Sequence, residues 1–139
     1  MRDSILIVDD EPDDADLIRR AVLSLHPRSP VQAVTNGLDL KAYLDGQDRY
    51  ADREVFPYPG LILLDLRMPE MDGFEVLAWI KSQPLHAAIP VIVMSVFDQQ
   101  QIIGKAYQLG ARTFLSKPVN PERIRAAIRA LMLPIEFSG

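Results

Sequence analysis

Three apolar runs constrain the fold of this chain more than any other feature. They are ILIV at 5–8, LILL at 61–64 and VIVM at 91–94, and none of them alternates with polar residues. A strand that is solvated on one face alternates, so each run is expected to be buried on both faces, as in a parallel sheet covered by helices. Weaker strands are predicted at 31–34 (VQAV) and 112–116 (RTFLS). The sequence therefore predicts a five-stranded sheet.

Helical periodicity fills the segments between these strands. Five helices are predicted around 18–25, 38–44, 74–78, 102–107 and 124–131, where apolar residues recur on one helical face. Asp72 and Asn120 are suited to begin two of these helices, and Gly110 is suited to end another. Strand and helix thus alternate along the chain, which indicates an α/β fold with a parallel sheet and right-handed crossovers.

Length and composition restrict the class of protein. The 139 residues fit one domain, and the net charge of -4 argues against a basic nucleic-acid-binding face. There is no cysteine, which excludes disulfides and Cys-ligated zinc. No apolar run approaches the roughly 18 residues of a membrane span, and the N-terminal run is too short for a signal peptide. We therefore expect a cytoplasmic domain. The connection at 46–60 is long and polar, and such loops are commonly functional or mobile.

Polar side chains follow the predicted strands where each strand ends. Asp9 and Asp10 follow the first, Asp65 the third, Ser95 the fourth and Lys117 the fifth. Ligands of open parallel sheets bind outside the carboxyl ends of the strands, so these side chains are expected to converge. Each one alone also has a purely structural interpretation. The aspartates after the first strand or Ser95 would cap a helix, Asp65 would be a solvated strand end, and Lys117 would lie at the surface.

The chemistry of the set favours a phosphoryl-transfer site. Crowded carboxylates repel one another unless a cation lies among them. Oxygen ligands without His or Cys favour Mg²⁺, which commonly partners a phosphate. A carboxylate such as Asp65 can also act as a nucleophile and become an aspartyl phosphate. Mg²⁺, the Lys117 ammonium and the Ser95 hydroxyl would then neutralise the phosphoryl oxygens.

Five motifs, in this order, resemble the receiver domain of two-component response regulators, the CheY-like family. They are ILIVDDEP, TNG, LILLDLRMPEMDGFE, IPVIVMS and GARTFLSKP, and they cover nearly the whole chain. The resemblance implies a flavodoxin-like (βα)5 fold, doubly wound, with strand order 2-1-3-4-5. It assigns residues 1–133 to the receiver domain and 134–139 to a C-terminal tail, with no separate effector domain.

The same resemblance implies how the acidic residues act. Asp65 is the phosphoacceptor. Asp10 binds Mg²⁺ directly, Asp9 assists through water, and Asp65 and the backbone carbonyl of Arg67 complete the metal ligands from the protein. The chain is then a phosphoacceptor that catalyses its own phosphorylation and dephosphorylation, and it is not otherwise an enzyme.

The resemblance also implies roles for residues of the last two strands. Ser95 hydrogen-bonds the phosphoryl group, and Lys117 pairs with Asp65 at rest and with the phosphoryl group afterwards. The bond before Pro118 is cis. Phe114 is the switch aromatic, at a position where tyrosine is common, and Ser95 stands where threonine is common.

The implied function is that of a stand-alone response regulator in a phosphorelay. It receives the phosphoryl group from a sensor histidine kinase and signals by protein–protein binding. The 46–60 connection is similar to that of receivers paired with phytochrome-type kinases. A homodimer through the fourth helix, fifth strand and fifth helix is expected. Arg67 and Phe97 beside the site are poor bases, so we predict a long-lived phosphoryl state.

Three other classes compete with this interpretation. A haloacid-dehalogenase-type phosphatase needs a second Asp two residues after its nucleophile, where this chain has Arg67. A receiver fold without chemistry would lack Asp10, Asp65 or Lys117, and all three are present. A flavodoxin-like FMN binder needs a Ser-, Thr- and Gly-rich loop after its first strand, where this chain has DDEPDD.

Overall fold

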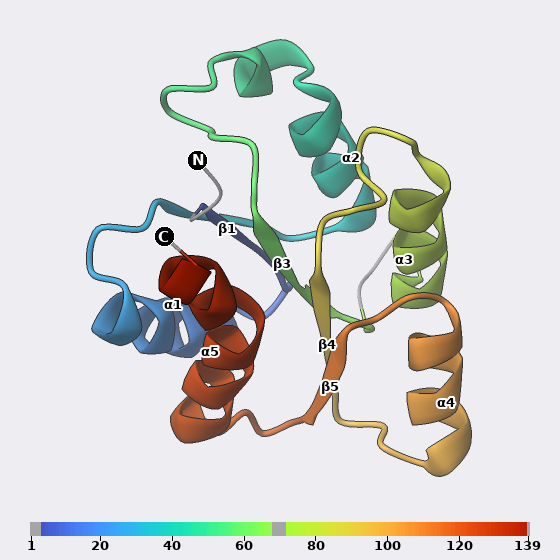
Figure 1. The fold of residues 1–139 in the computed structure, drawn as a ribbon. Helices are drawn as coiled ribbons and strands as arrows, with labels where there is room; N and C mark the ends of the chain where they lie inside the picture. Colours follow the sequence, from blue (N-terminus) through green and yellow to red (C-terminus); the bar gives the residue numbers. More distant parts are fainter. Residues whose placement is uncertain (1–3, 68–71, 139) are drawn as a thin grey trace.

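A computed structural model describes residues 4–67 and 72–138 of the chain, with side chains as far as Leu131. Five parallel strands form one sheet in the order β2-β1-β3-β4-β5 (Figure 1). The strands are β1 (Ile5–Val8), β2 (Val31–Val34), β3 (Leu61–Asp65), β4 (Val91–Ser95) and β5 (Thr113–Ser116). The predicted flavodoxin-like order is therefore confirmed.

Helices cover both faces of the sheet. They are α1 (Pro12–Leu25), α2 (Gly37–Asp45), α3 (Gly73–Ser82), α4 (Gln100–Gln108) and α5 (Pro121–Ser138), with a short 3-10 helix, η1 (Asp48–Ala51). Helices α1 and α5 lie together on one face, and α2, α3 and α4 lie on the other (Figure 1). Among the described residues, no helix has both the length and the apolar character to cross a membrane.

Two hydrophobic cores explain why the strands do not alternate. Ile5 and Ile7 of β1 pack in a cluster with residues of α1 and α5. Leu6 and Val8 pack in a second cluster with residues of α2 and α3. Every residue of β1, β3 and β4 is buried. Because both sides of each strand face apolar helices, both sides carry apolar residues.

Local sequence signals set the helix boundaries. The Asn36 side chain accepts a hydrogen bond from the Asp39 N–H at the start of α2. Asp72 and Glu75 form a capping box at the start of α3. Gly110, which ends the α4 turn, has a φ of +110°, a conformation that favours glycine. The hydrogen bonds of Asn36 and of the capping box satisfy backbone N–H groups that have no partner within the helix.

The 46–60 connection is a packed element of the fold. The rings of Tyr43, Tyr50 and Phe56 lie with centroids 5.0 to 6.0 Å apart. The Arg53 guanidinium donates to the carbonyl oxygens of Tyr43 and Leu44, at 2.9 and 3.0 Å. Arg53 thereby satisfies backbone acceptors in the last turn of α2, which a helix cannot satisfy internally.

The structure departs from the sequence-based boundaries at two positions. Asp65 and Ser95 are the last residues of β3 and β4, and do not follow these strands. Helix α5 runs to Ser138, so residues 134–138, expected to form a tail, continue that helix. The side chains of this segment lie outside the described residues, as does Gly139.

Candidate functional site

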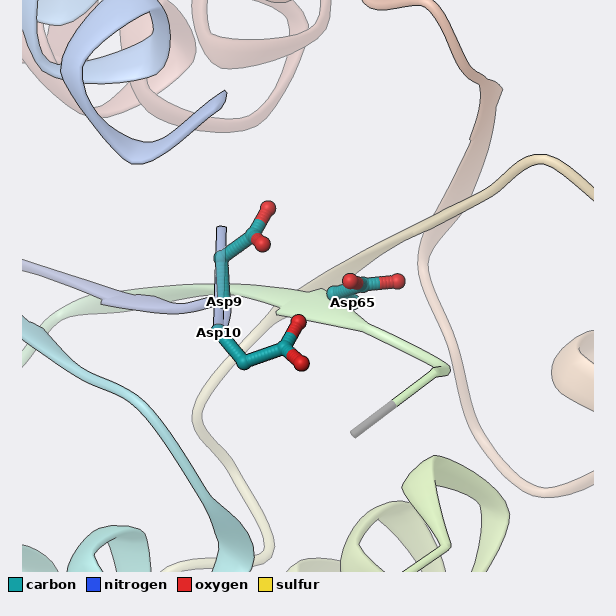
Figure 2. A group of neighbouring side chains, drawn as sticks. All are labelled: Asp9, Asp10 and Asp65. Atoms are coloured by element: carbon teal, nitrogen blue, oxygen red, sulfur yellow. The ribbon is translucent and has the colours of Figure 1, made fainter. Parts of the chain in front are cut away.

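Three carboxylates meet at the carboxyl ends of β1 and β3. Val8 pairs with Leu64 in the parallel register, which places Asp9 and Asp10 beside Asp65. One carboxylate oxygen from each of the three lies within 4.8 Å of the others (Figure 2). Asp9 and Asp65 are buried, whereas Asp10 is exposed. The site thus consists of two buried acids, Asp9 and Asp65, and one acid at the surface, Asp10.

Backbone hydrogen bonds orient the two buried acids. Asp9 Oδ1 accepts the N–H of Glu11 at 2.9 Å. Asp65 Oδ1 accepts the N–H of Arg67 at 3.0 Å. In each case the carboxylate receives the amide two residues later, which holds the side chain against its own turn. The Oδ2 atom of both residues is left for another partner.

That partner is Lys117, which follows β5. The Lys117 N–H donates to the carbonyl oxygen of Ser95 at 2.8 Å, which fixes the backbone beside β4. The Nζ atom then donates to Asp9 Oδ2 at 2.9 Å and to Asp65 Oδ2 at 3.1 Å. It also donates to Asp14 Oδ2, at 2.8 Å. The next peptide bond, to Pro118, is cis.

Burial and neighbouring charges shift the pKa values of Lys117 and Asp9. Burial opposes the charged form of Lys117, but its hydrogen bonds with Asp14 and Asp9, and the Asp65 charge, outweigh burial and raise its pKa. Burial raises the pKa of Asp9, although the Glu11 N–H and Lys117 act in the opposite direction. The ammonium thus stays charged, while the buried acid at Asp9 is incompletely compensated by its hydrogen bonds.

The site opens into a pocket of about 160 Å³. Its lining consists of Asp10, Glu11, Asp14, Asp65, Arg67, Val96 and Lys117. The acids in this lining outnumber the two basic side chains, so the pocket is suited to a small cation. All of the acidic donors are carboxylate oxygens, and such a donor set fits Mg²⁺.

Ser95 and Phe114, the other predicted site residues, are not among the residues that line this pocket. Ser95 is fully buried, and its Oγ accepts the Phe97 N–H at 3.0 Å. Phe114 is half-buried and packs against the core under α2, α3 and α4. Its N–H donates to the Tyr107 hydroxyl at 3.2 Å, which joins β5 to α4. Of the predicted site residues, the structure brings Asp9, Asp10, Asp65 and Lys117 into one cluster.

The structure does not support the purely structural interpretations of Ser95 as a helix cap and of Asp65 as a solvated strand end. Glu11 is at the start of α1 and Gln99 at the start of α4, and neither helix has a side-chain cap hydrogen bond. Ser95 therefore does not cap α4. Asp65 is only 3% exposed and is not a solvated strand end.

Asp14 is the site residue that sequence reasoning missed. It lies in the first turns of α1, four positions after Asp10, and its contact with Lys117 spans 103 residues. The acidic stretch DDEPDD contained a usable signal. The start of α1 faces the carboxyl edge of the sheet, so an acid one helical turn beyond Asp10 returns toward the same pocket.

Comparison with known proteins agrees with this geometry. The profile of the response regulator receiver domain matches residues 5–129. The response regulator Rcp1 of Synechocystis sp. is 34% identical over 116 residues, which cover 84% of this chain and 77% of Rcp1. Several longer curated relatives are regulators of which this chain spans only about one third to one half.

Solved structures of phytochrome response regulators share the fold. The phosphorylated cyanobacterial regulator RcpA has a TM-score of 0.80 and 32% identity, with 95% of this chain and 92% of RcpA covered. The bacteriophytochrome response regulator RtBRR has a TM-score of 0.82 and 31% identity, with coverages of 94% and 78%. The Mn²⁺-bound form of Rcp1 has a TM-score of 0.77 and 31% identity, with coverages of 94% and 91%. The chain therefore belongs to the response regulator receiver domain family.

Proposed function

We propose that the chain accepts a phosphoryl group on Asp65 from a histidine kinase and signals through protein–protein contacts. One observation carries this proposal: the Lys117 ammonium bridges the two buried carboxylates, at 2.9 Å from Asp9 and 3.1 Å from Asp65. A buried nucleophile beside a fixed cation can receive a dianionic group, because the cation compensates the added charge.

In the proposed transfer, a carboxylate oxygen of Asp65 attacks the phosphorus of a phosphohistidine. The new P–O bond forms as the P–N bond breaks. The electron pair of the P–N bond leaves on the imidazole nitrogen. The product is an aspartyl phosphate. Lys117 donates to a phosphoryl oxygen, and the buried Ser95 hydroxyl provides a second donor. Little covalent chemistry is required of the protein, so positioning and charge supply the catalysis.

A divalent cation is part of the proposal. Asp9, Asp10 and Asp65 would hold Mg²⁺ together with the backbone carbonyl of Arg67. The bound ion would neutralise phosphoryl oxygens during transfer. The three carboxylate oxygens within 4.8 Å of one another support this site. The relative Rcp1 has a Mn²⁺-bound form, which agrees with an oxygen-ligand cation site.

The proposed partners follow from the relatives and the exposed surface. Relatives named as phytochrome response regulators support a phytochrome-type histidine kinase as donor, and a cytoplasmic setting. For output we propose a homodimer through α4, β5 and α5. Tyr107, on α4, is 48% exposed, and its hydroxyl accepts a hydrogen bond from β5, so it offers apolar area where α4 meets β5.

Intact mass after incubation with acetyl phosphate tests the acceptor chemistry. We expect the mass of one phosphoryl group to be gained, and only with Mg²⁺ present. Asp65→Asn should gain nothing. The matched control is Asp13→Asn, an exposed aspartate of α1. If the wild type gains no mass from acetyl phosphate or from a phosphorylated kinase, the proposal is wrong.

Size-exclusion chromatography of the same samples tests the output. We expect a dimer that Tyr107→Glu disrupts, while phosphoryl uptake by that variant remains normal. A monomer before and after phosphorylation would contradict the dimer and leave the acceptor chemistry standing.

A further inference from the structure

His86 is a buried titratable side chain that the proposed function does not use. It lies in the α3–β4 turn, residues 83–90, and is 3% exposed. This turn and the 46–60 connection precede β4 and β3, so both lie at the amino ends of the strands, away from the acidic pocket (Figure 1). The His86 ring contacts Asp45, at the end of α2, and Tyr58, of the 46–60 connection. His86 therefore joins three segments at this end of the sheet.

The three contacts around His86 need three protons. The Tyr58 hydroxyl donates to the Leu85 carbonyl oxygen at 2.8 Å and lies 2.6 Å from His86 Nδ1. A hydroxyl has one proton, so a hydroxyl that donates to the carbonyl can only accept from Nδ1, which must then carry a proton. On the other side, Nε2 lies 2.9 Å from Asp45 Oδ1, and an ionised carboxylate only accepts. All three hydrogen bonds are therefore made only if both ring nitrogens are protonated.

A neutral His86 ring must give up one of these hydrogen bonds. With its proton on Nε2, the ring keeps Asp45, and Nδ1 accepts the Tyr58 proton. The hydroxyl oxygen then faces the Leu85 carbonyl oxygen at 2.8 Å with no proton between them. With its proton on Nδ1, the ring keeps Tyr58, and the Nε2 lone pair faces the Asp45 carboxylate. In either form one contact changes from attraction to repulsion.

The charged groups around His86 act in both directions. The Asp45 carboxylate favours the charged ring. Burial disfavours it, as does the Lys81 ammonium of α3, which donates to two carbonyl oxygens of the same turn at 3.1 and 2.8 Å. Without the Asp45 charge, only influences that oppose the charged ring remain among the described residues. The two other cations nearby lie over the rings of Tyr58 and Trp79 that flank His86, and they are Arg53 and Lys41.

We infer that His86 is a charged imidazolium in this structure and forms a pH-sensitive link, which holds the 46–60 connection and the end of α2 to the α3–β4 turn. Histidine is the side chain that ordinarily changes charge between about pH 5 and 8. The link is complete while the ring is charged and is weakened when the proton leaves, so a rise in pH loosens the 46–60 connection. The link acts at the opposite end of the sheet from Asp65, so it does not rest on the proposed phosphoryl transfer.

Nitrogen-15 NMR of the two imidazole rings, His26 and His86, tests the charge. In a titration from about pH 5 to 8, we expect both His86 nitrogens to be protonated at the lower end and one of them to lose its proton as the pH rises. Asp45→Asn removes the counter-charge at a side chain that is 40% exposed, so the variant should fold. His86 should bind its proton about two- to fivefold more weakly in this variant, while His26 is unchanged.

Amide hydrogen exchange tests the link itself. The N–H groups of Tyr50 and Phe56 are hydrogen-bonded within the 46–60 connection. After correction for the intrinsic pH dependence of exchange, their exchange should rise by about fivefold or more as His86 loses its proton. Tyr58→Phe lacks the hydroxyl and should exchange at the faster rate at every pH. His26→Gln is the control and should keep the pH dependence of the wild type.

Three results would each overturn the inference. They are a His86 ring that keeps one charge state throughout the titration, unchanged His86 protonation in Asp45→Asn, and exchange that does not follow the charge of His86. None of these measurements involves phosphoryl uptake, so their failure would leave the proposed function standing.

Discussion

The guanidinium of Arg67 lies over the ring of Phe97, 5.3 Å from the ring centroid. Arg67 follows β3 and Phe97 follows β4, so the stack joins the two loops on either side of the pocket. Phe97 is also tied to the site through the hydrogen bond from its N–H to Ser95 Oγ. Neither side chain is a base that can activate water, and Arg67 lines the pocket that contains Asp65.

The stack predicts slow hydrolysis of the aspartyl phosphate. In the wild type we expect a phosphoryl state that persists far beyond seconds, because a general base typically contributes about 10²-fold or more and none adjoins the site at these positions. Phe97→Ala should shorten the half-life, because Arg67, which lines the pocket, then loses the ring over which it lies. The time course of intact mass after removal of acetyl phosphate measures both.

Lys105→Ala is the control for this prediction. It breaks a comparable pair, in which the Lys105 ammonium lies 4.5 Å from the centroid of the Phe74 ring. We expect its half-life to match that of the wild type. A wild-type half-life of seconds would contradict the prediction, as would equal half-lives in the wild type and Phe97→Ala.

Lys117→Met should reduce both chemistry and stability. The substitution leaves the buried carboxylates of Asp9 and Asp65 without a counter-charge, which costs about 3 kcal/mol or more in the free energy of unfolding. Phosphoryl uptake should fall below detection. Mg²⁺ should raise the thermal midpoint of Lys117→Met more than that of the wild type, since the added cation compensates the same carboxylates.

Lys41→Met provides the comparison for this loss. Lys41 lies over the Trp79 ring, 5.2 Å from its centroid, and has no carboxylate partner among the described side chains. Its free energy of unfolding should change by about 1 kcal/mol or less. Equal destabilisation of the two variants in chemical denaturation would show that Lys117 is not a special counter-charge.

The sheet and the acidic cluster could be predicted because their signals are local. The apolar runs at 5–8, 61–64 and 91–94 reach into buried strands of the structure with shifts of at most one residue. A residue at the carboxyl end of a parallel strand is placed by the strand order. The proximity of Asp9, Asp65 and Lys117 could therefore be predicted from the sequence.

Contacts that depend on the rotation of a helix or the path of a loop were not predictable in this way. The stretch DDEPDD indicated that an acid of α1 returns toward this edge of the sheet, but not that Asp14 contacts Lys117, which lies 103 residues away in the sequence. Arg53 caps α2 only because the 46–60 segment folds back on that helix. The composition of this segment is polar, and its three aromatic contacts depend on tertiary packing. The intrinsic preference of a residue for helix, strand or loop does not indicate which distant residues it will contact.

Tyr43 predicts a loss of stability in alkaline solution. Burial raises the pKa of Tyr43 to about 12 from its usual 10.0. Above pH 10.0 the unfolded chain therefore releases this proton while the folded chain retains it, so stability falls as the pH rises toward about 12. The expected loss is about 2 kcal/mol at the upper end of that window.

Tyr43→Phe tests this prediction. Its stability at pH 7 should be lower by about 1 kcal/mol, because the hydroxyl donates to the Pro57 carbonyl oxygen at 2.9 Å. Between pH 10 and 12 its denaturation curve should lose less stability than that of the wild type. Parallel losses in the two proteins would show that Tyr43 ionisation is not the cause.

Gly73 links the start of α3 to the acceptor strand. A Cβ atom built on Gly73 would lie 2.4 Å from Leu66 Cα and 2.5 Å from Leu66 O. Both are backbone atoms of the residue after Asp65, and the Leu66 carbonyl oxygen already accepts a hydrogen bond from the Gly73 N–H at 3.0 Å. Gly73→Ala should therefore push Leu66 away, lower the free energy of unfolding by about 3 kcal/mol and slow phosphorylation of Asp65.

Gly104→Ala is the matched substitution on α4. Among the described residues, and apart from its chain neighbours and the backbone of its own helix, nothing lies within 4 Å of a Cβ atom at Gly104. Alanine should therefore increase stability there, by up to about 1 kcal/mol, through its higher helix propensity. Urea denaturation and acetyl phosphate uptake of the two variants give both comparisons. Wild-type phosphorylation in Gly73→Ala would show that the backbone after Asp65 tolerates displacement, and the close approach of α3 to Leu66 would then have no part in positioning the acceptor.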